Sequence, residues 1–174
     1  MALALAALVT AVIVAVSLLR PGPPSEIRIE KGAPAPTFAG TTLDGQPLAL
    51  ADLRGRPVIV NFWGPSCVPC RAEFPLLLRK LEEHAADELA IVGVLMFDPP
   101  APARDFVAEF GATWPTIDDP DGAIRRAYRA VARPQTYFID RDGILRGIQV
   151  GELTDADFER LFASISGPAA ASTP

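Results

Sequence analysis

The two cysteines of this 174-residue chain, Cys67 and Cys70, lie two residues apart in the segment NFWGPSCVPC, residues 61–70. Such a pair could form a structural disulfide, provide half of a metal site, or carry out thiol-disulfide exchange. A structural disulfide between them would close a very short loop, which stabilises a fold by about 2 kcal/mol, against about 4–5 kcal/mol for a long loop. The spacing is therefore poorly suited to a purely structural role.

A metal site within the chain lacks ligands. Structural zinc needs four of them, and the other soft or imidazole donors are His84 and Met96. His84 lies in EEHAADE, a segment typical of a solvated helix face. We therefore predict no metal site, although Cu(I) can be held by two thiolates and leaves a copper carrier as an alternative.

The redox interpretation requires a reactive first thiol and a second thiol close by. The apolar run PVIVNFW predicts a buried strand, and Ser66 is an N-cap candidate for a helix from Cys67 to about residue 86. Cys67 would lie at the helix N-terminus, where free N–H groups and the helix dipole stabilise a thiolate. Cys70 would follow one turn later on the same face, within reach of a mixed disulfide. This arrangement favours exchange and is typical of thioredoxin-like redox motifs.

Other patterns predict the elements that position this motif. Two turn signals, Asp44-Gly45 and Arg141-Asp142-Gly143, each predict a hairpin. We further expect a buried strand at 88–97, helices at 103–111 and 119–131, the second capped near Asp119 or Asp121, and a final helix capped by Thr154 or Asp155. This order can be built as one mixed sheet covered on both faces.

The N-terminal residues 2–19 contain no charged side chain. A helix of this length spans roughly 27 Å, close to the ~30 Å hydrocarbon core of a bilayer. We expect a transmembrane anchor or uncleaved signal at 1–19, a proline-rich linker at 20–31, one globular domain at 32–166 and a flexible tail at 167–174. A cleaved signal peptide is the alternative, although no basic residue precedes the apolar run.

Together these segments resemble the membrane-tethered thiol-disulfide oxidoreductases of bacteria, the TlpA/ResA/CcmG group of the thioredoxin superfamily. The resemblance covers roughly residues 32–165, and its motifs are GAPAPTFAGTTLDGQPLALADLRGRPVIVNFW, CVPCRAEFP, RPQTYFID and DGILRGIQVGEL. It implies an α/β fold of the thioredoxin-like type. A mixed central sheet would be flanked by helices, with an N-terminal β-hairpin and a central insert, and preceded by one transmembrane helix.

The resemblance also implies roles for individual residues. Cys67 matches the catalytic nucleophile and Cys70 the resolving thiol, and the two form the redox disulfide. Pro134 matches the cis-proline of the superfamily. Glu73 matches an acidic position beside the cysteines, and because Asn61 replaces the buried acid of thioredoxins, Glu73 is the expected proton carrier. A Glu73 that is simply exposed to water is the alternative.

Two further accessory residues are Trp63, at the end of the predicted strand, and Arg133. Two positions depart from the family pattern, since most relatives carry tryptophan where this chain has Ser66, and an uncharged residue where it has Arg133. If Arg133 faces Cys67, its charge would favour the thiolate and acidic partners. An Arg133 directed toward solvent is the alternative.

The resemblance implies an enzyme, an extracytoplasmic thiol-disulfide oxidoreductase anchored in the cell membrane by a single pass. The partners would be protein disulfides, with apocytochrome c or its maturation factors as expected clients, and a membrane electron donor. A proline before Cys70, as in the CGPC of thioredoxin, favours a reductant. No cofactor is implied, and the domain is expected to be monomeric. The net charge of −5 and the lack of a Lys/Arg cluster argue against nucleic acid.

Three alternatives follow from the same residues. The enzyme could reduce other extracytoplasmic protein disulfides. A copper carrier of this fold would carry CxxxC and a distant histidine ligand, both of which are absent. A peroxiredoxin would carry a threonine three residues before its peroxidatic cysteine, and this chain has Gly64 at that position.

Overall fold

The central strand β3, Val58–Trp63, is buried along its entire length, as its largely apolar sequence predicts. It pairs in parallel with β4, Ala90–Leu95, and antiparallel with β6, Gln135–Ile139. The short strand β5, Thr116–Asp118, extends the sheet beyond β4, and β7, Leu145–Val150, extends it beyond β6. The sheet order is therefore β5-β4-β3-β6-β7, which confirms the predicted mixed sheet.

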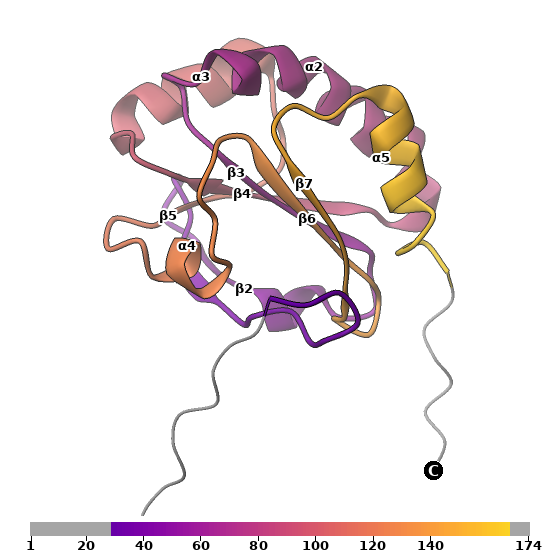
Figure 1. Cartoon of the computed structure of the whole chain (residues 1–174). Coiled ribbons are helices and arrows are strands. Elements are labelled where there is room, and N and C mark those ends of the chain that lie inside the picture. Colours follow the sequence, from indigo (N-terminus) through magenta and orange to yellow (C-terminus); the bar gives the residue numbers. More distant parts are fainter. Residues whose placement is uncertain (1–28, 168–174) are drawn as a thin grey trace, which may run out of the picture.

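The computed structural model describes residues 29–167, so the predicted anchor at 2–19 lies outside the described residues. Among the described residues, no helix combines the length and apolarity needed to span a bilayer. Figure 1 shows the helices on both sides of the sheet, with α2, α3 and α5 on one side and α4 on the other. Helix α2 comprises Val68–Glu83, α3 comprises Pro100–Phe110, α4 comprises Ala123–Ala127 and α5 comprises Asp155–Phe162.

Strands β1, Ala39–Thr41, and β2, Pro47–Ala49, form the predicted N-terminal hairpin around Asp44-Gly45. A short 3-10 helix, η1, follows it at Leu50–Leu53. The second predicted hairpin is also confirmed, since β6 and β7 flank the turn that contains Gly143, whose φ is 73°. Helix α3 and strand β5 form the insert after β4.

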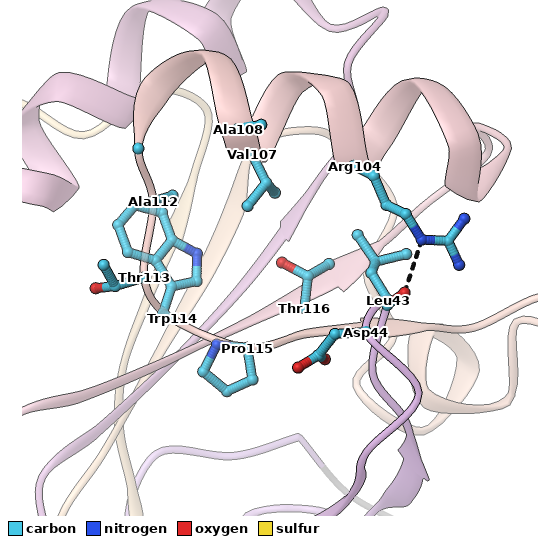
Figure 2. A pocket seen from close by; sticks show the side chains of 11 residues that line it. Leu43, Asp44, Arg104, Val107, Ala108, Ala112, Thr113, Trp114, Pro115 and Thr116 are labelled. Atoms are coloured by element: carbon cyan, nitrogen blue, oxygen red, sulfur yellow. Dashed lines mark hydrogen bonds between the residues drawn. The ribbon is translucent and has the colours of Figure 1, made fainter.

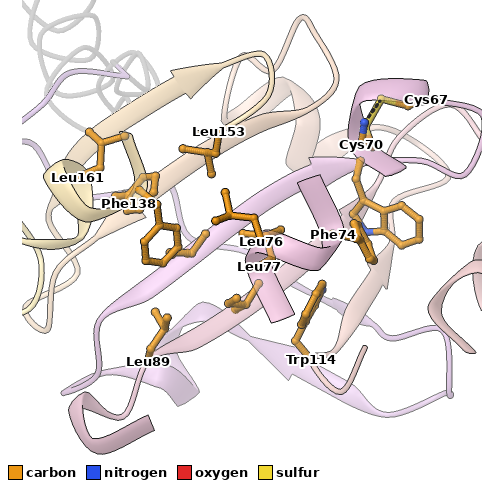
Figure 3. Packing of buried hydrophobic residues seen from close by; sticks show 14 of the residues in the cluster. Cys67, Cys70, Phe74, Leu76, Leu77, Leu89, Trp114, Phe138, Leu153 and Leu161 are labelled. Atoms are coloured by element: carbon orange, nitrogen blue, oxygen red, sulfur yellow. Dashed lines mark hydrogen bonds between the residues drawn. A yellow bond between two sulfur atoms is a disulfide. The ribbon is translucent and has the colours of Figure 1, made fainter. Parts of the chain in front are cut away.

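Two apolar clusters lie on opposite faces of the sheet because side chains alternate along β3. Ile59 and Trp63 pack against α2, α3 and α5, whereas Val60 and Phe62 pack against the α4 side. Figure 3 shows the first cluster, in which Cys70 and Phe74 lie at one end, Leu161 lies at the other, and Leu76 and Leu77 lie between them. The cysteine pair is thus part of a packed core.

Several helix boundaries differ from the prediction. Cys67, not Ser66, is the N-cap of α2, since its sulfur accepts a hydrogen bond from the Cys70 amide. Helix α2 ends at Glu83 because a 3-10 turn, η2 at Ala85–Asp87, follows it. Helix α4 is shorter than expected and ends before Arg129, whose φ is 50°.

The predicted caps of the last two helices are confirmed. The Asp119 carboxylate accepts hydrogen bonds from the Ile124 and Arg125 amides at the start of α4. Thr154 caps α5, and its hydroxyl accepts a hydrogen bond from the Asp157 amide at 3.1 Å. Short polar side chains satisfy free N–H groups at helix starts in this way.

Gly93 in β4 makes room for two buried side chains of its neighbours. A Cβ atom at this position would lie 2.6 Å from Trp63 Nε1 and 2.5 Å from Thr116 Oγ1. Both side chains are buried, at 0% and 4% exposure, so a methyl group at position 93 would have to displace them. The absence of a side chain at position 93 is therefore a packing requirement.

We expect Gly93→Ala to lower the free energy of unfolding by about 1–3 kcal/mol, the usual range for overpacking a core. Gly167→Ala is the control, because nothing lies within 4 Å of a Cβ atom at that position. Denaturant unfolding of both variants measures the difference. Equal effects of the two substitutions would contradict the packing role of Gly93.

Candidate active site

Cys67 and Cys70 form a disulfide with an S–S distance of 2.11 Å and Cα atoms 5.2 Å apart. The Cys70 amide donates a hydrogen bond of 3.2 Å to Cys67 Sγ, shown as the dashed line in Figure 3. This donor and the N-terminus of α2 are suited to stabilising a thiolate on Cys67. Cys70 is the more deeply buried of the two, at 1% exposure against 7% for Cys67.

A cleft of about 380 Å³ opens beside Cys67 and does not include Cys70. Its lining residues are Cys67, Pro69, Met96, Phe97, Val131, Ala132 and Arg133. They come from the start of α2, the loop after β4 and the loop before β6. The cleft therefore gives one cysteine, Cys67, access to a partner.

Apolar side chains stand at the edge of this region. Val68, Phe97 and Val131 are more than two-thirds exposed, although side chains of this kind are usually buried. Phe97 has a φ of 66°, a left-handed conformation that costs energy for a bulky residue. A protein surface presented to Cys67 would meet these side chains first.

Arg133 neither points freely into solvent nor leaves its charge unpaired. Its Nη1 donates to Asp98 Oδ2 at 2.6 Å and to the Met96 carbonyl at 2.5 Å. Its Nη2 donates to Ser66 Oγ at 3.2 Å. The alternative of an Arg133 directed toward solvent is therefore wrong, because Arg133 lines the cleft of Cys67 with its charge paired to Asp98. An effect of Arg133 on the Cys67 thiolate stays a prediction.

Asp98 joins Arg133 to the segment just before Cys67. Its Oδ2 accepts hydrogen bonds from the Ser66 hydroxyl at 2.8 Å and the Ser66 amide at 3.2 Å. Desolvation raises the pKa of Asp98, but the hydrogen bonds from Ser66 and Arg133 outweigh it, so its pKa lies below the usual range. Asp98 is thus an ionised carboxylate. It accepts a hydrogen bond from the Ser66 hydroxyl, a group that the tryptophan found at this position in most relatives would not provide.

The peptide bond between Arg133 and Pro134 is cis, as the resemblance implies. Trp63, in contrast, does not line the cleft. Its indole ring is fully buried and packs against Phe74 and Phe106 with centroid distances of 4.8 and 5.0 Å. An accessory role for Trp63 stays a prediction, and its position is that of a core residue behind the disulfide.

Glu73 is buried at 1% exposure, so the alternative of a water-exposed carboxylate is wrong. It follows Cys70 by three residues in α2 and shares its buried face. Asn61 Nδ2 donates to Glu73 Oε1 at 3.0 Å, and the Leu153 amide lies 3.4 Å from Oε2. Desolvation, reinforced by the charge of Glu152, raises the pKa of Glu73 to about 8 against these hydrogen bonds. A carboxyl group with this pKa can bind and release a proton near neutral pH.

A polar group at the junction of α2 and α5 resembles a ligand set but is explained by ion pairs. Potential ligand atoms of Glu83, His84 and Glu159 lie within 4.8 Å of one another. Lys80 Nζ already pairs with Glu159 at 2.5 Å and with Glu83 at 2.7 Å. His84 is only 17% exposed and packs on Phe162, which corrects the prediction of a solvated histidine.

A second cavity, of about 610 Å³, lies away from the cysteines between α3 and the segment that leads into β5. Figure 2 shows its walls, which include Leu43, Val107 and Trp114. Arg104 closes one side and donates to the Leu43 carbonyl at 2.7 Å. Neither a thiol nor a group of raised pKa faces this cavity, so the chemistry of the chain lies at the Cys67 cleft.

Known proteins resemble this chain in sequence and in fold. The model of the AhpC/TSA family matches residues 31–148. The thioredoxin-like protein YneN of Bacillus subtilis is 35% identical over 138 residues, covering 78% of this chain and 80% of YneN. The thiol-disulfide oxidoreductase ResA of Geobacillus kaustophilus is 34% identical over 134 residues, or 77% of each chain. A solved structure from Chlorobium tepidum, described as a candidate thiol:disulfide interchange protein DsbE, has a TM-score of 0.74 at 28% identity, covering 80% of this chain and all of its own.

A thioredoxin-like fold with a CxxC disulfide at a helix N-terminus defines the class of this protein, and its relatives bear the same activity in their names. The protein is a thiol-disulfide oxidoreductase of the ResA/DsbE type. The chain belongs to the AhpC/TSA family.

Two residues of the site escaped the sequence analysis. Asp98 and Phe97 follow β4 directly, and the carboxyl end of a strand beside the central one is where a side chain can reach a neighbouring loop. The position of Phe97 and Asp98 shortly after a predicted strand was therefore the signal in the sequence that could have identified them. The partners of Asp98, however, lie more than thirty residues away in each direction along the chain.

Replacing Glu73 with glutamine should stabilise the oxidised protein progressively as the pH rises. The pKa of about 8 lies above the ordinary value of 4.5, so the native carboxyl keeps a proton that the unfolded chain releases. The wild type therefore loses stability between these two pH values. Each unit of raised pKa corresponds to about 1.4 kcal/mol, so the gain should reach several kcal/mol by pH 8. Denaturant unfolding of the disulfide form at pH 5 and pH 8.5 measures it, and an equal gain at both pH values would contradict a buried, protonated Glu73.

Proposed function

We propose that this enzyme is an extracytoplasmic reductant of protein disulfides, held at the membrane by residues 2–19. Its proposed clients are the cysteines of apocytochrome c or of its maturation factors. The observation that carries the reductase proposal is the asymmetry of the cysteine pair. Cys67 lines an open cleft, whereas Cys70 is buried in the same helix as Glu73, one turn before it.

This asymmetry supports a two-step exchange. The Cys67 thiolate attacks one sulfur of the substrate disulfide, and the other substrate sulfur leaves as a thiolate that takes up a proton. Cys70 then loses its proton and attacks Cys67 Sγ, which closes the Cys67–Cys70 disulfide and releases the second substrate thiolate. The two electrons of the dithiol pass to the substrate.

In its ionised form, Glu73 is the proposed acceptor of the Cys70 proton. Its pKa of about 8 is close to the ordinary thiol pKa of about 8.5, so a proton can move between the two groups at little cost. Asn61, which donates to Glu73, cannot itself exchange a proton at these pH values. A Glu73→Gln variant should accordingly show an altered pH–rate profile for exchange.

The direction of electron flow follows from the groups around Cys67. CVPC shares the proline of the CGPC motif in thioredoxin, whose potential is about −270 mV, whereas the oxidant DsbA lies near about −120 mV because its reduced form is strongly stabilised. The Arg133 charge, which would push the potential upward, is paired with Asp98. Both features favour a reductant.

The cellular setting rests on the sequence and on the resemblance to the ResA/CcmG group. An uncharged run at 2–19 followed by a proline-rich linker suits a single-pass anchor. A reductant in an oxidising compartment must be recharged from inside the cell, so the proposal includes a membrane electron donor. Haem attachment requires reduced cysteines in apocytochrome c, and the resemblance supports these as the proposed client.

The N-terminal part of the chain also resembles peroxiredoxins, so a peroxidase is the second candidate. The cleft argues against it. A Cβ atom at Gly64 would lie 2.2 Å from Asp98 Oδ2 and 2.3 Å from Arg133 Nη1, so a threonine at this position beside Cys67 would require the Asp98–Arg133 pair to move. Purified protein should therefore not consume peroxide at a catalytic rate.

Substituting the cysteines one at a time tests the order of attack. Cys67→Ser should abolish disulfide exchange. Cys70→Ser should instead accumulate a mixed disulfide through Cys67, because the resolving thiol is missing. Mass spectrometry of trapped adducts identifies the linked cysteine, and a mixed disulfide found only in Cys67→Ser would reverse the assignment.

Deleting the protein in its native host should lower the amount of c-type cytochromes, and external dithiothreitol should restore it. Complementation with the full chain should succeed, whereas complementation with the Cys67→Ser/Cys70→Ser double variant should fail. A chain lacking residues 2–19 should fail as well if the anchor delivers the domain to the correct compartment. Haem staining of membrane proteins measures the outcome, and normal cytochromes in the deletion strain would favour the alternative of other disulfide clients.

A further inference from the structure

We propose that Asp98 and Arg133 are positioning residues that set the stability of the Cys67 thiolate through their opposite, mutually compensating charges. The inference deepens the proposed function and rests on its assignment of Cys67 as the attacking thiol. Among the described residues, neither Asp98 nor Arg133 forms a hydrogen bond with a cysteine sulfur. Arg133 acts from the wall of the cleft that Cys67 lines, and Asp98 acts from behind it, bonded to Arg133 and to Ser66.

The geometry places both charges close to Cys67. Arg133 lines the cleft with Cys67, and its guanidinium bonds to the hydroxyl of Ser66, the residue before that cysteine. Asp98 accepts both the hydroxyl and the amide of Ser66. The two side chains are only 20% and 12% exposed, so water screens them much less than it screens a surface ion pair.

The network also excludes other side chains from this place. A Cβ atom at Gly64 would collide with both Asp98 and Arg133, so the pair occupies the space beside the segment that leads into Cys67. Arg133 Nη1 bonds to the Met96 carbonyl as well. The pair thus joins three loops of the cleft and holds its two charges at fixed positions.

Because the charges are opposite and adjacent, their effects on a nearby thiolate largely cancel. Removing the Asp98 charge alone would leave Arg133 unpaired and would stabilise the thiolate. Removing the Arg133 charge alone would leave a carboxylate beside Cys67 and would destabilise the thiolate. A purely structural pair behaves differently, because either substitution breaks the same contact and both should then act in the same direction.

The other charged groups near the cysteines differ from this pair. Arg71, directly after Cys70, pairs with Glu109, and both side chains are about half exposed. Glu73 lies on the buried side of α2 one turn after Cys70, and the charge of Glu152, an exposed residue after β7, helps to raise its pKa. The N-terminal end of α2 favours a Cys67 thiolate in every variant, so it does not obscure a comparison between them.

The test compares Asp98→Asn, Arg133→Gln and the double variant in the full-length, reduced protein. The pH dependence of iodoacetamide labelling, with the Cys67 peptide quantified by mass spectrometry, gives the acid dissociation constant of Cys67. We expect Asp98→Asn to raise this constant at least threefold and Arg133→Gln to lower it at least threefold. The double variant should return to within twofold of the wild type. At pH 9, the equilibrium constant for oxidation by glutathione should fall in Asp98→Asn and rise in Arg133→Gln.

Two control variants separate charge from structure. Ser66→Ala removes the hydroxyl link without changing any charge, and Glu109→Gln unpairs the exposed Arg71, so both should leave the Cys67 constant within twofold. The inference is overturned if the two single variants shift the constant in the same direction, or if neither shifts it more than the controls. If one single variant fails to fold, the other still tests the inference, because each has its own expected direction of shift in the Cys67 constant. Preferential labelling of Cys70 would instead contradict the proposed function on which the inference rests.

Discussion

Burial of β3 on both faces is the constraint on which the site depends. Its side chains fill the apolar cluster on each side of the sheet, so neither its register nor its direction can change without exposing one set of them. The chain leaves β3 at Trp63 and enters α2 five residues later. Cys67 must therefore lie at the N-terminus of α2, with its amide donors and its dipole.

The same burial sets the properties of the polar groups behind the disulfide. Asn61 lies in β3 between apolar residues, where it donates to Glu73 and to Thr136. Packing a carboxyl group into this site opposes its ionisation and raises its pKa. This buried carboxyl group lowers the stability of the fold at pH values above its ordinary pKa, and the large apolar cores around it offset that loss. The carboxyl group can therefore exchange protons near neutral pH.

The open side of the site is built differently, from loops at the ends of strands. The segment before Cys67, the loop after β4 and the loop before the cis Pro134 meet there, joined by Asp98 and Arg133. Phe97 can keep its exposed, left-handed conformation because its neighbours Met96 and Asp98 are both held by hydrogen bonds from Arg133. The packed core behind the disulfide and the exposed loops in front of it thus meet at Cys67 Sγ.

Local sequence was sufficient to predict the strand, the helix, both hairpins and the thiol pair, because these depend on apolar patterns, turn residues and a spacing of three within a helix. It was not sufficient to predict whether Glu73 was buried, or what Arg133 bonds to. Burial of Glu73 depends on Asn61 and Leu153, which approach from β3 and from the segment after β7. The charge of Arg133 is balanced by Asp98, 35 residues away. The sequence determined the reactive motif, whereas its electrostatic environment was decided only when folding brought distant segments together, since charge interactions depend on distance in space and on burial.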